Sequence, residues 1–112
     1  MTAKKTLIVI KSRPFTSLNN YEALRTAAGL WDHEVKVLWM GEGVYAALDR
    51  ADKTLTGKFL ADMPDLDIEM YVDEESLIAK GFTEDKLVES AVPASRAMVK
   101  ELLGWAEASL VF

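Results

Sequence analysis

Three consecutive acidic residues, Asp73, Glu74 and Glu75, follow the apolar segment 68–72. That segment is typical of a strand, so we expect the carboxylates where a strand ends and a helix over 74–80 begins. Two carboxylates can perform acid/base chemistry if burial raises the pKa of one of them. The structural alternative is that Asp caps the helix and the glutamates lie in its first turn, which stabilises a helix by about 0.5 to 2 kcal/mol. No catalytic motif stands out, so we assign no catalytic residue.

Two arginines follow expected strands and suggest a second kind of chemistry. Arg13 comes after segment 6–11 and Arg96 after segment 87–92. Guanidinium groups and hydroxyls near helix N-termini can hold a small anion such as a phosphate or a carboxylate. Alternatively, the arginines are solvated or paired at an interface. If the chain binds an anion, we expect the ligand-binding residues to be Ser12, Arg13, Glu42, Asp73, Glu74 and Arg96.

The composition excludes several classes of function. The chain has no cysteine and one histidine, which removes disulfides, thiolate metal sites, persulfide carriers and most zinc or triad chemistry. We therefore expect no metal and no cofactor. His33 precedes an expected strand, so we place it in solvent at the opposite end of the sheet from the other candidates.

The charge and size set further limits. The net charge is −5, which argues against nucleic acid as a partner, because phosphate contacts need a basic face. No apolar run approaches the roughly 18 to 20 residues of a membrane span. The 112 residues are enough for one domain, 1–112, with its own core. Since the first residues lead directly into a strand with no separate apolar leader, we expect a cytoplasmic protein without membrane contact.

Strands and helices are expected to alternate along the chain. The apolar run Leu7-Ile8-Val9-Ile10 indicates a strand buried on both faces, at the centre of a parallel sheet. Helix 19–30 is expected to be capped by Ser17, Asn19 or Asn20 and to bury one face that includes Trp31. The full set of expected strands is 6–11, 34–40, 68–72, 87–92 ending before Pro93, and 108–112. The helices between them are 19–30, 44–48, 55–63, 74–80 and 94–104, the last with Met98, Leu102 and Leu103 on its buried face. This order predicts an α/β fold with three layers and right-handed crossovers.

Four segments in this order carry a resemblance to a known family. They are the opening KTLIVIK of 5–11, WMGEGVYAAL of 39–48, YVDEESLIAKGF of 71–82 and the closing SLVF of 109–112. The chain resembles the DsrE/DsrF/DsrH-like family, which includes the sulfur-relay subunits TusB, TusC and TusD. The resemblance implies a five-stranded parallel sheet with the last strand beside the first. It also implies a dimer, trimer or hexamer, built from this chain alone or with DsrE-like paralogues.

The resemblance also shows what this chain lacks. In the sulfur-carrying members, a cysteine just after the third strand receives persulfide sulfur, whereas this chain has Val72-Asp73-Glu74 in that region. A carboxylate cannot accept sulfane sulfur, because the reaction needs a polarizable thiolate. Direct sulfur transfer by this chain is therefore not expected.

Three functions remain as hypotheses. The first is a non-catalytic DsrE/DsrF-like subunit that forms an oligomer and serves as a scaffold or partner-binding component in sulfur relay. Trp105 and Phe112, late in the chain, are the expected interface residues. The second is a binding module for a small anionic ligand. The third is a cysteine-independent enzyme that uses Asp73 or Glu74 as an acid or base.

Overall fold

The structure is a computed structural model that describes residues 4–14, 18–30 and 32–112. Five parallel strands form one sheet in the order β4-β3-β2-β1-β5. The strands are β1 (Lys5–Ile10), β2 (Glu34–Trp39), β3 (Glu69–Asp73), β4 (Ala91–Ala94) and β5 (Ala108–Val111). The expected α/β class, the sheet of five parallel strands and the pairing of the last strand with the first are all confirmed.

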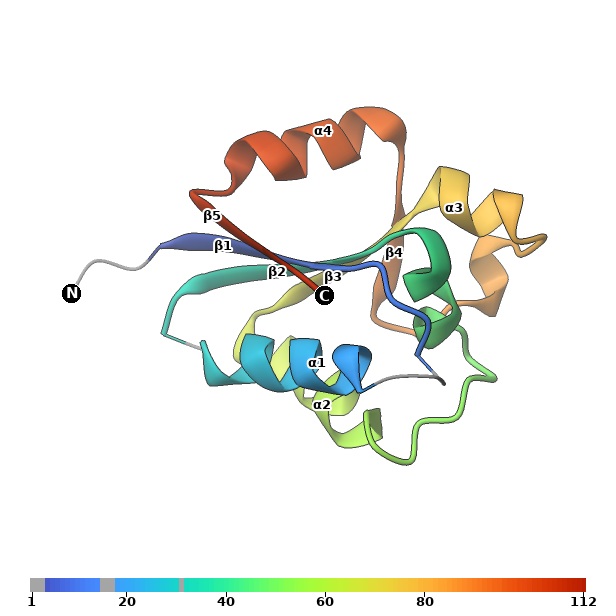
Figure 1. The fold of residues 1–112 in the computed structure, drawn as a ribbon, viewed down its shortest axis with the longest axis horizontal. Helices are drawn as coiled ribbons and strands as arrows, with labels where there is room; N and C mark the ends of the chain where they lie inside the picture. Colours follow the sequence, from blue (N-terminus) through green and yellow to red (C-terminus); the bar gives the residue numbers. More distant parts are fainter. Residues whose placement is uncertain (1–3, 15–17, 31) are drawn as a thin grey trace.

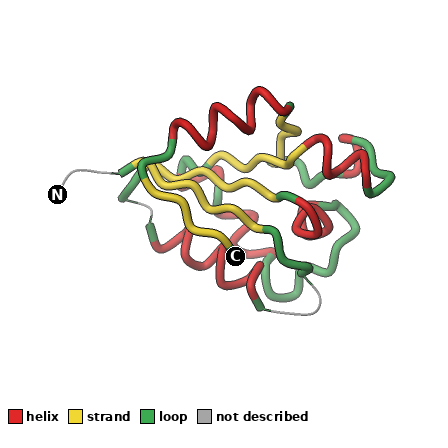
Figure 2. The backbone as a smooth tube through the Cα atoms, turned by 45° about the horizontal axis from the view of Figure 1, so that its top comes forward, coloured by secondary structure: helices red, strands yellow, loops and turns green. Residues whose placement is uncertain are grey.

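Helices cover both faces of the sheet (Figures 1 and 2). On one face lie α1 (Asn19–Gly29) and α2 (Gly57–Asp62), and on the other lies α4 (Arg96–Trp105), while α3 (Glu74–Ala79) follows the end of β3. The described residues also form three 3-10 helices, namely η1 (Gly41–Ala47), η2 (Pro64–Leu66) and η3 (Glu84–Lys86). In the part of the chain that is described, no helix is long and apolar enough to cross a membrane.

The first strand lies between two hydrophobic cores, as its unbroken apolar run predicts. Ile8 and Ile10 belong to the core beneath α1 and α2, and Leu7 and Val9 to the smaller core beneath α4. All four side chains are almost completely buried. Because successive strand residues point to opposite faces, such a strand requires cover on both sides.

The fourth strand differs from the prediction. It was expected over 87–92 and ending before Pro93, but β4 runs from Ala91 to Ala94 and contains the proline. Proline is tolerated because β4 is an edge strand, where a missing amide need not break a ladder bond. Leu87 forms an isolated antiparallel bridge with Leu48 instead.

The last helix buries a different face from the one predicted. Leu102 is buried as expected, together with Val99, but Met98 and Leu103 are 39% and 50% exposed. The helix is amphipathic, and only the narrow stripe that meets β1 and β4 is covered. The N-cap is Ser95, whose hydroxyl accepts a hydrogen bond from the amide of Met98 at 3.2 Å.

Two further predictions about single residues are wrong. His33 is not solvent-exposed, because its side chain is only 17% accessible and its Nδ1 accepts a hydrogen bond from the amide of Lys4 at 3.0 Å. No asparagine side chain caps α1, whose N-cap residue is Leu18. The other expected cap, Ser17, and the expected helix-face residue Trp31 lie outside the described residues.

Candidate functional site at the carboxyl end of the sheet

The candidate site lies where β1, β2 and β3 end, at the edge that holds ligands in many open parallel sheets. η1 follows β2 directly, and its backbone approaches the end of β1 very closely. The amide of Met40 donates to the carbonyl of Ile10 at 2.9 Å, and a Cβ on Gly43 would lie 2.1 Å from that same oxygen. Only glycine fits at position 43, and this contact fixes Glu42 beside the end of β1.

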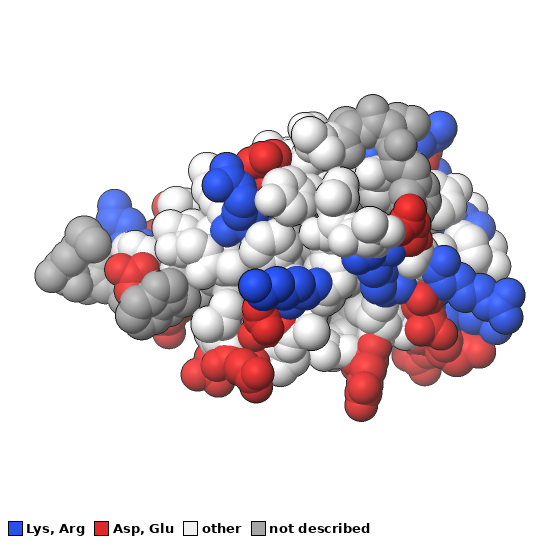
Figure 3. Space-filling model, turned by 90° about the horizontal axis from the view of Figure 1, so that it is seen from below, with Lys and Arg blue, Asp and Glu red and all other residues white. Residues whose placement is uncertain are grey.

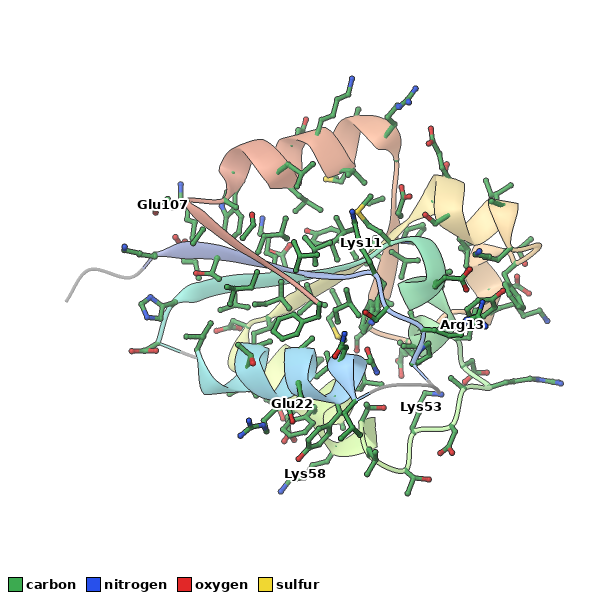
Figure 4. The ribbon with its side chains drawn as sticks, viewed as in Figure 1. Lys11, Arg13, Glu22, Lys53, Lys58 and Glu107 are labelled. Atoms are coloured by element: carbon green, nitrogen blue, oxygen red, sulfur yellow. The ribbon has the colours of Figure 1, made fainter. Side chains whose placement is uncertain are left out.

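Glu42 is the centre of a small ionic cluster. Its Oε1 lies 2.9 Å from Nζ of Lys80, and its Oε2 lies 3.4 Å from a terminal guanidinium nitrogen of Arg13. Figure 4 shows Arg13 beyond the end of β1, on the side of η1. Residues from three parts of the chain therefore meet at one carboxylate.

The electrostatics of the cluster follow from these contacts. The hydrogen bond from Lys80 lowers the pKa of Glu42, burial opposes the shift, and the charges of Lys80 and Arg13 add to it. Nζ of Lys80 also lies 5.8 Å from the ring centre of Tyr45, and that ring makes an edge contact with Phe82. Since Glu42 supplies a counter-charge to both cations, a free anion would have to compete with it.

Asp73 belongs to a second, separate set of contacts. It occupies the N-cap position of α3, but its carboxylate does not accept from the amides of the first turn. Instead, Oδ2 accepts the hydroxyl of Ser76 at 2.5 Å, and the hydroxyl oxygen accepts the amide of Gly41 at 3.0 Å. This chain of hydrogen bonds ties the start of η1 to α3, and Asp73 is only 8% exposed.

The remaining predicted ligand residues are dispersed. Ser12 accepts a hydrogen bond from the side-chain amide of Asn19 at 3.0 Å. Arg96 is 3.8 Å from Glu75, and both side chains are largely exposed. Glu74 is exposed on α3. Of the six predicted residues, the structure joins Arg13 and Glu42 in one cluster.

Lys80 and Ser76 were not anticipated from the sequence, although Lys80 pairs with Glu42, and Ser76 is hydrogen-bonded to both Asp73 and Gly41. The sequence did indicate one thing about Lys80, namely that it lies in the last turn of a helix. It directly precedes Gly81, whose φ of 83° ends α3 in the left-handed conformation that favours glycine. A lysine in that last turn is near η1, but only the folded register shows that it reaches Glu42.

The expected interface residues Trp105 and Phe112 are both half-buried. Trp105 lies beneath Nζ of Lys36, 4.4 Å from the ring centre, and Phe112 packs against the core beneath α1. The more exposed apolar side chains near them are Leu103 on α4 and Leu110 and Val111 on β5. Every residue of β5 is exposed, and its outer edge has no neighbouring strand among the described residues.

No group of three or more His, Asp or Glu side chains in the described ranges could hold a metal ion. On the face that carries α1 and α2, lysine and arginine side chains are interspersed with acidic ones (Figure 3). The charge on this face is therefore mixed, in keeping with the mixed composition.

Fold and sequence together define the class of this protein. The chain belongs to the DsrE/DsrF-like family, whose model matches residues 4–112. It is similar in structure to the YchN protein of E. coli, with a TM-score of 0.84 and 16% identity over 97% of this chain and 99% of that one. It is also similar to MTH1491 of Methanobacterium thermoautotrophicum, a protein of unknown function, with a TM-score of 0.69 and 14% identity over 99% and 100% of the two chains. No curated protein matches the sequence.

Proposed function

We propose that this chain is a non-catalytic DsrE/DsrF-like subunit, which forms an oligomer and serves as a scaffold or partner-binding component in sulfur relay. The family membership supports the pathway. The observation that supports oligomer formation is the edge of β5, which has no neighbouring strand among the described residues and has apolar side chains around it.

The chemistry at the end of β3 supports a non-catalytic role. The chain has no thiol, and the region after the third strand presents carboxylates. Asp73 is buried and accepts a hydrogen bond from Ser76, which in turn accepts one from the amide of Gly41. These bonds support a structural role for Asp73, which is to hold η1 against α3. Sulfur transfer needs a thiolate, which a paralogous chain would have to supply.

The two edges of the sheet are protected to different degrees. At the β4 edge, Pro93 removes one amide, and a proline discourages the addition of another strand. The β5 edge reads Ala-Ser-Leu-Val and has no proline, glycine or charged residue. Natural proteins seldom leave an apolar edge strand unprotected unless another chain covers it.

The surface of α4 extends this apolar edge. Trp105 contacts Lys36 of β2, which places that side of the helix over the middle of the sheet. Leu103 projects from nearly the opposite side of the helix to Trp105, because two residues along an α-helix turn the side-chain direction by about 200°. Leu103 is therefore on the flank of α4 away from Trp105, and Val111 of β5 is 63% exposed on the same face of the sheet as the buried Val9.

Assembly can be measured by native mass spectrometry and light scattering on protein isolated gently from its own host. We expect an oligomer of this chain, or a complex with a DsrE-like paralogue. Val111→Lys introduces a charge on the open edge and should dissociate the complex. The matched control is Val92→Lys, because Val92 is 52% exposed on the opposite edge strand and should tolerate the lysine. A monomer at all concentrations, or dissociation by the control alone, would contradict the proposal.

A further inference from the structure

A pocket of about 360 Å³ lies beside α3, near β4 and so at the opposite side of the sheet from the β5 edge. α3 and the segment that follows it form one side, and Pro93 of β4 forms the other. Figure 1 shows these elements together at one end of the sheet, where α3 and the chain after it lie next to β4. The volume falls within the range of sites that bind small groups, about 300 to 1,000 Å³.

The floor and one wall of this pocket are apolar. Leu77 is buried at its base, and Phe82 and Pro93 contribute further apolar surface. Ile78 also lines the pocket, and it is 64% exposed, the largest exposed fraction among the large apolar side chains of the described residues. Apolar surface therefore continues out of the pocket onto the outside of α3, which favours a ligand larger than a single small molecule.

Two carboxylates, Glu74 and Glu84, lie at the same pocket. Neither makes a hydrogen bond or an ion pair with its side chain to any other described residue. Their neighbours differ, since Glu75 pairs with Arg96, and Asp85 pairs with Lys86 and accepts the hydroxyl of Thr83. The pocket thus combines an apolar floor with two negative charges that have no counterion among the described residues.

We propose that this pocket docks an arginine or lysine side chain of a partner protein, flanked there by apolar residues. The aliphatic stem of such a side chain covers apolar surface, and its cationic head reaches a carboxylate at the rim. Charge complementarity selects this occupant, because an acidic partner would be repelled by both glutamates and by the net charge of −5. The inference deepens the proposed function, since it names the chemistry of one partner surface.

The probe is the peptide acetyl-Ala-Leu-Arg-Leu-Ala-amide, titrated into the full ¹⁵N-labelled chain and followed by amide chemical shifts. We expect saturable shifts confined to residues 74–84 and 91–94. The control peptide, with glutamate in place of arginine, should leave those amides unchanged. Shifts spread over other surfaces, or equal binding of the acidic peptide, would overturn the proposal.

Variants test the two halves of the pocket separately. Glu74→Gln and Glu84→Gln should each weaken binding about two- to fivefold, as expected for a partly exposed ion pair, and raised salt should weaken it further. Ile78→Ser should also weaken binding, and the factor by which it does so should not change with salt, because the substitution removes apolar contact and no charge. Glu101→Gln removes the same charge from an exposed position on α4 and should have no effect.

The oligomeric state of each sample separates this proposal from the proposed function. If Val111→Lys dissociates the oligomer and the monomer still binds the peptide, both hold. If the chain assembles but neither glutamate variant changes peptide affinity, the pocket assignment fails and the assembly stands. If the chain stays monomeric yet binds the peptide, the assembly fails and the pocket stands.

Discussion

The hydroxyl of Ser76 donates to the carboxylate of Asp73 across 2.5 Å. The two residues are three positions apart, at the start of α3. An aspartate before a helix usually accepts hydrogen bonds from the amides of the first turn. Here Asp73 accepts from the hydroxyl of Ser76 instead, and that hydroxyl oxygen accepts from the amide of Gly41. The carboxylate is therefore a structural link between two strand ends.

Ser76→Ala should lower the free energy of unfolding by about 1 to 3 kcal/mol, because it leaves the buried Asp73 carboxylate and the amide of Gly41 without this partner. Urea denaturation measures the loss. Ser90→Ala is the control, since Ser90 is exposed and should change stability by less than about 0.5 kcal/mol. Equal stability of the two variants would show that the hydrogen-bond chain contributes nothing.

Glu42 predicts a pH dependence of stability. Its pKa is lowered in the folded state, chiefly by the hydrogen bond from Lys80, so its contribution is present above the ordinary glutamate pKa of about 4.3. That contribution is lost as the pH falls below this value through the folded pKa. Glu42→Gln should therefore melt at a lower temperature than the wild type at pH 7 and at the same temperature in acid. Thermal melts between pH 2 and pH 7 test this; a difference independent of pH would contradict it.

Gly43→Ala should be strongly destabilising, by about 1 to 3 kcal/mol or more, because the new Cβ would lie 2.1 Å from the Ile10 carbonyl oxygen. The matched control is Gly104→Ala in α4, where a Cβ meets nothing within 4 Å. That control should stabilise by about 0.5 to 1 kcal/mol, since alanine favours a helix over glycine. Denaturant midpoints of the two variants should move in opposite directions.

Tyr71 should ionise late in an alkaline titration. Burial raises its pKa to about 12, and the hydrogen bond to Glu69 and the charge of that carboxylate add to the effect. Because the folded pKa lies above the unfolded value of about 10, the contribution to stability is complete below that pH and is lost as the pH rises toward 12. Ultraviolet absorbance of the tyrosinate should show a late ionisation step, and Tyr71→Phe should remove that step.

The sequence predicts the centre of the fold better than its edges. The run Leu7-Ile8-Val9-Ile10 has one explanation, a strand buried on both sides, and the structure confirms it. At the edge, Pro93 was interpreted as a strand end, although an edge strand can contain it. Whether a strand is central or at the edge depends on the order of the sheet, which short-range patterns do not contain.

The role of Asn20 shows a similar limit. An asparagine at the start of a helix predicts a cap, but its side chain is buried and Oδ1 accepts the indole Nε1–H of Trp39 at 3.1 Å. A buried indole N–H requires a hydrogen-bond acceptor. Asn20 is that acceptor for Trp39, which lies on β2, 19 positions later in the sequence. The Glu42 cluster was only half foreseen for the same reason, because Lys80 reaches it through the packing of α3 against η1.

The pairing of β5 with β1 has a consequence for folding during translation. The amide of Lys5 bonds to the side chain of Glu107, 102 positions later, and Thr6 to Val9 are paired with the last strand. β1 therefore has a neighbouring strand on both sides only after β5 has formed. Contacts so far apart in sequence slow folding. We infer that a nascent chain keeps one side of β1 open until β5 has been synthesised, so a chaperone that shields apolar strand edges would act on it before that point.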